Sequence, residues 1–166
     1  MSSSAVISDI VRHLARLLQQ RGSLLACAES CTGGWIAQVI TDQPGSSAWF
    51  DRGFVTYSNL AKTQMLGVEP TLLERQGAVS QAVAEAMVTG ALVHSAADYA
   101  VAVTGIAGPG GGSMDKPVGT VWLAWAGPCG VESQLQHFTG DRMAIRQATV
   151  QAALVGLEQR CFAELS

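Results

Sequence analysis

The sequence predicts an α/β protein with a three-layer α/β/α architecture and a mixed, mostly parallel central sheet that includes a late antiparallel hairpin. Amphipathic helical segments alternate with short apolar segments, which is typical of a sheet covered by helices on both faces. Late in the chain, two strand-like segments flank the turn Gly-Pro-Cys-Gly, and this predicts the hairpin. Because the 166 residues contain no linker and no internal repeat, we expect residues 1–166 to form one domain.

The first half of the chain opens with an amphipathic helix. Apolar residues recur at helical spacing from Ile7 to Leu18, and Gly22 then acts as a stop, so the helix is predicted over 5–21. A short buried strand is expected over 23–28.

A second helix follows, opened by the segment 33–35 and ended by Asp42 and Pro44. We expect a loop or short helix over 45–50. The β-branched and aromatic residues of 53–57 then predict a strand.

Three helices are expected next. Asn59 can cap a helix that runs through Met65, and Pro70 suits the first turn of another helix. Ser80 is expected to cap a long, alanine-rich helix over 81–96.

The last part of the chain is predicted to contain a buried strand over 98–103, a glycine-rich loop over 105–112 and the hairpin strands 120–126 and 131–138. Asp141 starts a final helix. Its apolar face is expected to comprise Val150, Leu154, Leu157, Cys161 and Leu165.

The composition excludes several classes of protein. Charged residues make up only 14% of the chain, against roughly 25% in a typical soluble domain, whereas disordered chains are rich in charge. The net charge of −3 and the lack of basic runs argue against nucleic acids and membrane surfaces as partners. No apolar stretch is long enough to span a membrane, and the first residues do not resemble a signal peptide. We therefore expect a cytoplasmic protein.

The cysteines give no indication of a metal site. Cys27, Cys31, Cys129 and Cys161 form no CxxC pair and have no histidine at metal-ligand spacing. We expect free buried thiols in a reducing compartment, and neither a metal nor another cofactor.

Ser30 lies where a predicted strand runs directly into a helix start. Thr32 and Gly33 follow it and begin that helix. Helix-start N–H groups attract anions and stabilise a developing oxyanion, so Ser30 is a candidate for catalysis. The alternative is an ordinary Ser/Thr helix cap.

Lys62 is one of only two lysines in the chain. Tyr57 and Lys62 lie around a predicted strand-to-helix turn and could face one pocket. Lysine can serve as a base because its pKa shifts readily on burial. The alternative is a solvated lysine on a helix.

Two further loops carry candidate binding residues. Thr104, Gly105 and Gly108 lie in a loop that continues a buried strand, where glycines allow backbone N–H groups to approach a ligand; the alternative is a flexible connection. Arg142 lies in the first turn of a helix, where the helix dipole disfavours a cation, so it is a candidate for binding an external anion. The alternative is an ion pair with Asp141.

The sequence resembles the CinA C-terminal domain family over about residues 6–160. The resemblance rests on the segments 28–34 (AESCTGG), 45–50 (GSSAWF), 53–59 (GFVTYSN), 77–80 (GAVS), 104–109 (TGIAGP) and 116–120 (KPVGT). It implies hydrolysis of nicotinamide mononucleotide to nicotinate mononucleotide and ammonia, in pyridine-nucleotide salvage. An alternative is a non-catalytic nucleotide-binding or regulatory module, and another is an amidase for a different phosphorylated amide.

Amide hydrolysis needs a nucleophile, a base and an oxyanion site. No histidine lies in the four loops that carry the candidate residues, namely those at Ser30, at 57–62, at 104–108 and at Arg142. This argues against a Ser-His-Asp triad and leaves a Ser-Lys or Ser-Tyr-Lys arrangement. We expect Ser30 to be the nucleophile and Lys62 the base, with Tyr57 relaying or orienting the proton. Ser47 is the rival nucleophile.

The remaining candidate residues are expected to bind the substrate. Thr104 and Gly105 are expected to position the carboxamide or hold the oxyanion, and Arg142 with the glycine-rich loop to take the 5′-phosphate. Thr32, Gly33 and Gly108 complete the predicted binding residues.

We also expect a homo-oligomer, most simply a homodimer. The chain has four tryptophans and few charges, so apolar surface is expected to remain uncovered. Trp49 and Phe50, in a predicted loop, are the expected subunit contact.

Overall fold

The computed structural model describes residues 1–163, and its centre is a five-stranded sheet of order β2-β1-β3-β4-β5. Strands β1, β2 and β3 are parallel, whereas β4 is antiparallel to β3 and to β5, so four of the five strands run in one direction. The predicted mixed sheet and late hairpin are therefore confirmed. The strands are β1 (Leu25–Glu29), β2 (Phe50–Val55), β3 (Tyr99–Gly105), β4 (Thr120–Gly127) and β5 (Gly130–His137).

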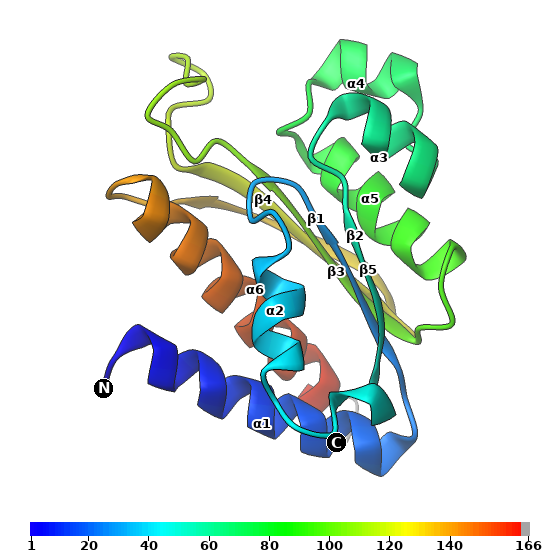
Figure 1. Cartoon of the computed structure of the whole chain (residues 1–166). Helices are drawn as coiled ribbons and strands as arrows, with labels where there is room; N and C mark the ends of the chain where they lie inside the picture. Colours follow the sequence, from blue (N-terminus) through cyan, green and yellow to red (C-terminus); the bar gives the residue numbers. More distant parts are fainter. Residues whose placement is uncertain (164–166) are drawn as a thin grey trace.

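Helices cover both faces of the sheet, which confirms the three-layer prediction (Figure 1). One layer contains α1 (Ser3–Arg21), α2 (Trp35–Thr41) and α6 (Arg142–Ala163). The other contains α3 (Asn59–Leu66), α4 (Pro70–Gln76) and α5 (Gln81–Val93). A short 3-10 helix, η1 (Ser46–Ala48), precedes β2.

Two apolar cores lie between these layers, and β3 contributes to both. Val101 and Val103 pack into the core under α1, α2 and α6, whereas Ala100 and Ala102 pack into the core under α5. A strand that is covered on both faces needs apolar residues at every position, which explains the continuous apolar run in its sequence. Burial of each such valine stabilises the fold by roughly 1.5–3 kcal/mol.

Helix α6 packs its predicted apolar face into the first core. The buried residues of that face are Val150, Leu154, Leu157 and Cys161. Leu165, the last predicted member, lies outside the described residues. Cys27 and Cys31 are also buried, as predicted, but Cys129 is exposed because it lies in the tight turn between β4 and β5.

Some predicted boundaries are wrong by a few residues. Strand β2 starts at Phe50 rather than at residue 53, and α5 ends at Val93 rather than at residue 96. The N-cap of α3 is Ser58, whose Oγ accepts a hydrogen bond from the Ala61 N–H (3.0 Å). Asn59, predicted as the cap, is already the first helical residue.

The prediction that Trp49 forms a subunit contact is also wrong. Trp49 is fully buried in the core, and Phe50 is partly buried against it. The Trp49 carbonyl accepts a hydrogen bond from the Leu25 N–H (2.8 Å), so this segment belongs to the start of the sheet. Trp49, which directly precedes β2, is buried because it packs into the core under α1, α2 and α6.

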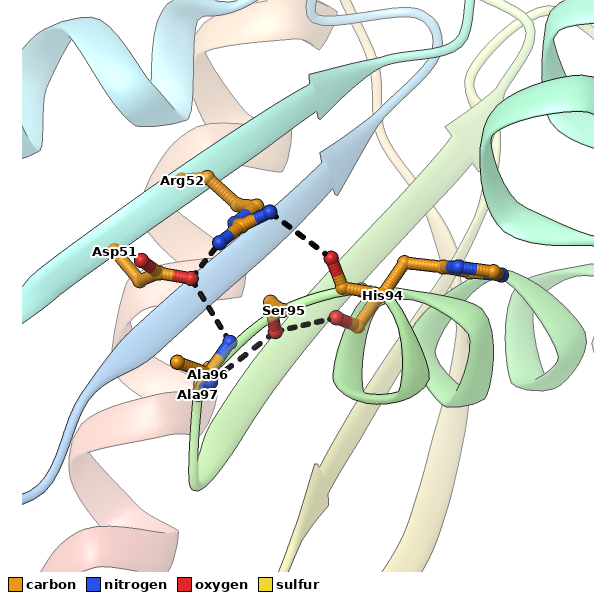
Figure 2. A network of polar contacts seen from close by, with 7 residues as sticks. Asp51, Arg52, His94, Ser95, Ala96 and Ala97 are labelled. Atoms are coloured by element: carbon orange, nitrogen blue, oxygen red, sulfur yellow. Dashed lines mark hydrogen bonds and ion pairs between the residues drawn. The ribbon is translucent and has the colours of Figure 1, made fainter.

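A polar network fastens the start of β2 to the end of α5 (Figure 2). The Asp51 carboxylate accepts hydrogen bonds from Arg52 Nε (2.7 Å) and from the Ala96 N–H (3.0 Å). Arg52 Nη1 also donates to the His94 carbonyl (3.2 Å). The hydrogen bonds from Arg52 and from the Ala96 N–H lower the pKa of Asp51. Edge strand β2 is thereby held in place, which matters because its carboxyl end leads to Tyr57.

Close packing of α3 on α5 sets the position of Lys62. A Cβ atom at Gly90 would lie only 2.0 Å from the Leu66 carbonyl oxygen, so the two helices can meet only where glycine stands. Lys62 lies one turn before Leu66 on α3. Gly90 therefore allows α3 to pack closely against α5, and the Lys62 side chain contacts Ser30 and Thr56, which directly follow β1 and β2.

Candidate active site

A cleft of about 290 Å³ opens at the carboxyl ends of the parallel strands. The carboxyl edge is where open α/β sheets bind ligands. The cleft is lined by six of the residues predicted from the sequence: Ser30, Tyr57, Lys62, Thr104, Gly105 and Arg142. Residues from four separate loops and helices therefore meet at one place.

Lys62 is buried beneath this cleft, with only 1% of its surface exposed. Its Nζ lies 3.0 Å from Ser30 Oγ, 2.9 Å from the Thr56 carbonyl oxygen and 3.3 Å from the Tyr57 carbonyl oxygen. No carboxylate is among these partners. Burial lowers the pKa of Lys62 because it disfavours the charged form.

The three contacts suit a neutral amine. The two carbonyl oxygens can only accept hydrogen bonds, so they take the two N–H groups of a neutral Lys62. The remaining lone pair then faces Ser30 Oγ, whose hydroxyl can donate to it. A neutral Lys62 would therefore be a proton acceptor beside a serine hydroxyl, which is the arrangement that an activated nucleophile requires.

Ser30 follows directly after β1 and is 8% exposed. Its N–H donates to the Val103 carbonyl (3.2 Å), so the sheet ladder continues one residue beyond the strand and fixes the backbone of Ser30.

Glu29, the last residue of β1, organises the loop that carries Ser30. Its buried carboxylate accepts hydrogen bonds from Thr32 Oγ1 (2.7 Å), the Ile36 N–H (2.8 Å) and the Ala37 N–H (3.0 Å). Glu29 therefore occupies the Ile36 and Ala37 N–H groups in the first turn of α2, and these two donors are not available to an external anion. The Thr32 hydroxyl points to Glu29 within the protein, so neither it nor Gly33 lines the cleft.

Arg146, a residue that the sequence did not indicate, holds the same loop from α6. Its Nε donates to the Cys31 carbonyl (3.0 Å), and its Nη2 donates to the Thr32 carbonyl (3.1 Å). Its guanidinium also lies over the Trp35 ring, 5.4 Å from the ring centroid. The available sequence feature is its position four residues after Arg142, which places both arginines on one side of α6.

Arg142 bridges the two sides of the cleft. Its Nη1 donates to the Gly108 carbonyl (2.7 Å), and its Nη2 donates to the Tyr57 hydroxyl (3.3 Å). The alternative ion pair with Asp141 is not found, because the Asp141 carboxylate accepts the Ala144 N–H (2.8 Å) and caps α6. Gly108 thus contributes a carbonyl to Arg142 and is not itself among the residues that line the cleft.

Thr104 and Gly105 form the floor of the cleft at the end of β3. Thr104 Oγ1 donates to the Ala78 carbonyl (2.9 Å), which leaves its oxygen able to accept a hydrogen bond from a ligand. The Ile106 N–H points to Thr120 on β4. Since amide directions alternate along a strand, the Gly105 N–H points the other way, to the side of β3 on which β1 lies.

Ser47 lies far from this cleft. It belongs to η1, which precedes β2, so it stands near the amino end of the parallel strands. A strand of the 6 residues of β2 spans about 20 Å, which separates Ser47 from the edge where Ser30 and Lys62 meet.

Within residues 1–163, no group of three or more His, Cys, Asp and Glu side chains is placed to hold a metal ion. No helix in that part of the chain is long and apolar enough to cross a membrane.

Comparison with known proteins places the chain in a family. The model of the CinA C-terminal domain matches residues 7–161. The chain belongs to the CinA C-terminal domain family. It is 55% identical over 153 residues to the nicotinamide-nucleotide amidohydrolase PncC of Pseudomonas putida, covering 92% of this chain and 96% of that protein.

Two further relatives agree with this membership. The PncC protein of Escherichia coli K12 is 51% identical over 155 residues, which cover 93% of this chain and 94% of the relative. The crystal structure of a competence/damage inducible protein from Agrobacterium tumefaciens is 48% identical and superimposes with a TM-score of 0.89, covering 93% of this chain and 96% of that one. At this similarity the CinA family fold is shared over almost the whole length.

Proposed function

We propose that this protein hydrolyses the carboxamide of nicotinamide mononucleotide to give nicotinate mononucleotide and ammonia, in pyridine-nucleotide salvage. The observation that carries the proposal is the buried contact of 3.0 Å between Lys62 Nζ and Ser30 Oγ. The names of the similar amidohydrolases supply the substrate. A non-catalytic module would have no need to bury a lysine without a carboxylate partner beside a serine hydroxyl.

The first half of the proposed reaction forms an acyl-enzyme. Ser30 Oγ attacks the carboxamide carbon while its proton passes to Lys62 Nζ. The tetrahedral intermediate then collapses, and the C–N bond breaks. Lys62 returns the proton to the departing nitrogen, which leaves as ammonia.

The second half releases the product. Water attacks the ester carbon, and Lys62 accepts a proton from that water. When the second tetrahedral intermediate collapses, the C–O bond to Ser30 breaks and Lys62 returns the proton to Ser30 Oγ. The product acid gives its remaining proton to solvent and leaves as the carboxylate, and both side chains are restored.

The floor of the cleft is suited to bind the reacting group. The Gly105 N–H, which lies on the β1 side of β3, would donate to the oxyanion, while Thr104 Oγ1 would accept from the carboxamide NH₂. A carboxamide offers one acceptor and two donors, so this pair satisfies both kinds of group.

Arg142 is the proposed ligand of the 5′-phosphate. A guanidinium has five N–H donors, and among the described residues Arg142 donates to Gly108 and Tyr57 only. The remaining donors can bind phosphate oxygens. Arg142 is exposed whereas Lys62 is buried, so a substrate would extend from the reacting centre toward solvent.

Incubation with nicotinamide mononucleotide tests the proposal, with ammonia and nicotinate mononucleotide measured as products. We expect wild-type protein and Ser47→Ala to form both products, and Ser30→Ala to lose at least about a thousandfold in kcat. Absence of product with the wild-type protein refutes the proposed activity. Full activity of Ser30→Ala refutes the assignment of the nucleophile.

We further propose that the protein acts as a homodimer formed through the edge strand β5. Val131 and Leu135 on this strand are 45% and 39% exposed, and Glu132 is its only charged residue apart from the histidine. Edge strands with few charges readily pair with a second chain. Light scattering at micromolar concentration tests this, and a monomeric mass would contradict it.

A cytoplasmic location is the last part of the proposal. Cys27 and Cys31 are buried thiols that form no disulfide, which suits a reducing compartment. Fractionation of cells that express the protein tests this location.

A further inference from the structure

The described part of the cleft has no carboxylate to bind the positively charged ring of the proposed substrate. The inference below rests on the proposed function. Among the described residues that line the cleft, Arg142 is cationic, the proposed base Lys62 is neutral in the form that accepts a proton, and there is no aspartate or glutamate. Nicotinamide mononucleotide carries its reactive carboxamide on a positively charged pyridinium ring. The ring must therefore be bound by something other than a carboxylate.

Tyr57 is the only aromatic side chain among these lining residues, and 63% of its surface is exposed. The face of an aromatic ring carries negative electrostatic potential and attracts cations. An exposed aromatic ring at the mouth of a cleft without carboxylates is thus the available partner for a cationic ring.

Two contacts hold Tyr57 in place without covering its ring. Its carbonyl oxygen accepts from Lys62 Nζ (3.3 Å), and its hydroxyl accepts from Arg142 Nη2 (3.3 Å). A side chain that is fixed before binding loses less conformational entropy when the ligand arrives. The ring is therefore preorganised as a flat binding surface.

We propose that the Tyr57 ring is the surface on which the cationic aromatic ring of the substrate stacks, and that Arg142 orients it through the hydroxyl. Tyr57 is then a specificity-determining residue rather than a proton relay. The contacts support this choice, because the Tyr57 hydroxyl meets the guanidinium of Arg142 while only the Tyr57 backbone carbonyl meets Lys62. A guanidinium stays protonated and cannot pass a proton onward.

The same arrangement explains how one substrate would be recognised at two points. The contact between Arg142 and the Tyr57 hydroxyl places the proposed phosphate ligand beside the proposed ring surface. The dianionic phosphate would also offset the repulsion between the guanidinium and the cationic ring. Dihydronicotinamide mononucleotide, which keeps the phosphate but has an uncharged and non-aromatic ring, should bind less tightly.

Three variants test the proposal by steady-state kinetics on nicotinamide mononucleotide. Tyr57→Phe keeps the ring but loses the contact with Arg142, so its KM should rise less than that of Tyr57→Leu, and its kcat should fall by far less than about a hundredfold, with an unchanged pH profile. Tyr57→Leu removes the ring, so its KM should rise roughly 5- to 30-fold with little change in kcat. Leu60→Ala is the matched control, because Leu60 is 64% exposed on the same segment but does not line the cleft.

A second measurement isolates the charge of the ring. The inhibition constant of dihydronicotinamide mononucleotide should change less than about threefold between wild type and Tyr57→Leu. Thermal melting of each variant shows whether it is folded.

Two outcomes overturn the inference while leaving the proposed activity intact: a loss of about a hundredfold or more in kcat for Tyr57→Phe, which indicates a proton relay, or an unchanged KM for Tyr57→Leu. Wild-type protein that releases no ammonia refutes the proposed function, and the inference with it.

Discussion

Lys62→Met is the substitution that most sharply probes the chemistry of the cleft. Methionine has nearly the length of lysine and fits a site that is 1% exposed, but it cannot accept a proton. The variant keeps Ser30 and its backbone contacts and removes only the amine. It therefore separates the base from the nucleophile.

The expected loss follows from what Lys62 does in the proposed mechanism. General acid–base catalysis contributes roughly 10²–10⁴-fold, which corresponds to about 2.7–5.4 kcal/mol of transition-state stabilisation. Lys62→Met should therefore lower kcat by at least about a hundredfold. The carbonyls of Thr56 and Tyr57 would also lose their donor, at a cost of roughly 1–3 kcal/mol each in the free energy of unfolding.

Ammonia release under saturating substrate is the assay, and Lys116→Met is the control. Lys116 is the other lysine of the chain, and its Nζ also donates to a carbonyl, that of Gln76 (2.9 Å), but it does not line the cleft. Its substitution should leave kcat close to wild type. A folded Lys62→Met protein with near-normal turnover would refute the role of Lys62 as base.

Three other predictions concern stability and cofactors. Hydrogen bonds from Arg52 and the Ala96 N–H lower the pKa of Asp51. The stability that they provide is therefore complete above about pH 4 and is lost as the pH falls through the folded-state pKa of Asp51. When the free energy of unfolding is measured against pH, Asp51→Asn should lose less stability on acidification than the wild-type protein. Glu29→Gln leaves a buried donor without an acceptor and should lower the free energy of unfolding by roughly 1–3 kcal/mol in urea titrations. Its kcat should also fall, because the loop that carries Ser30 loses its support. Unchanged stability would contradict the role of the hydrogen bonds to Glu29. Activity should persist in excess EDTA, and restoration of lost activity by a divalent cation would reveal a metal site.

Much of the fold could be predicted because local patterns and packing agree. The continuous apolar run of β3 predicts a strand that is covered on both faces, and helices α5 and α6 provide that cover. The contact between Ser30 and Lys62 also follows from this logic. Their segments leave neighbouring parallel strands at the same edge of the sheet, so they meet although 32 residues separate them.

Other features depend on packing that a single sequence does not encode locally. Trp49 lies in a segment with loop-like composition, and only its packing against residues distant in the sequence decides that it is buried. Arg146 reaches Cys31 in the Ser30 loop across 115 residues of sequence, and its spacing from Arg142 does not by itself distinguish it from a surface arginine. The choice between Ser30 and Ser47 as nucleophile depends on the direction of β2, because that direction places Ser47 at the opposite edge of the sheet from Ser30.

The central claim is that Ser30 forms a covalent acyl-enzyme when Lys62 removes its proton. Rapid quenching of the reaction in acid, followed by peptide mass spectrometry, tests it most directly. The account predicts an adduct on Ser30 with the mass of nicotinamide mononucleotide less that of ammonia, formed by the wild-type protein and absent from Ser30→Ala. An adduct on another residue, or full turnover by Ser30→Ala, would contradict it.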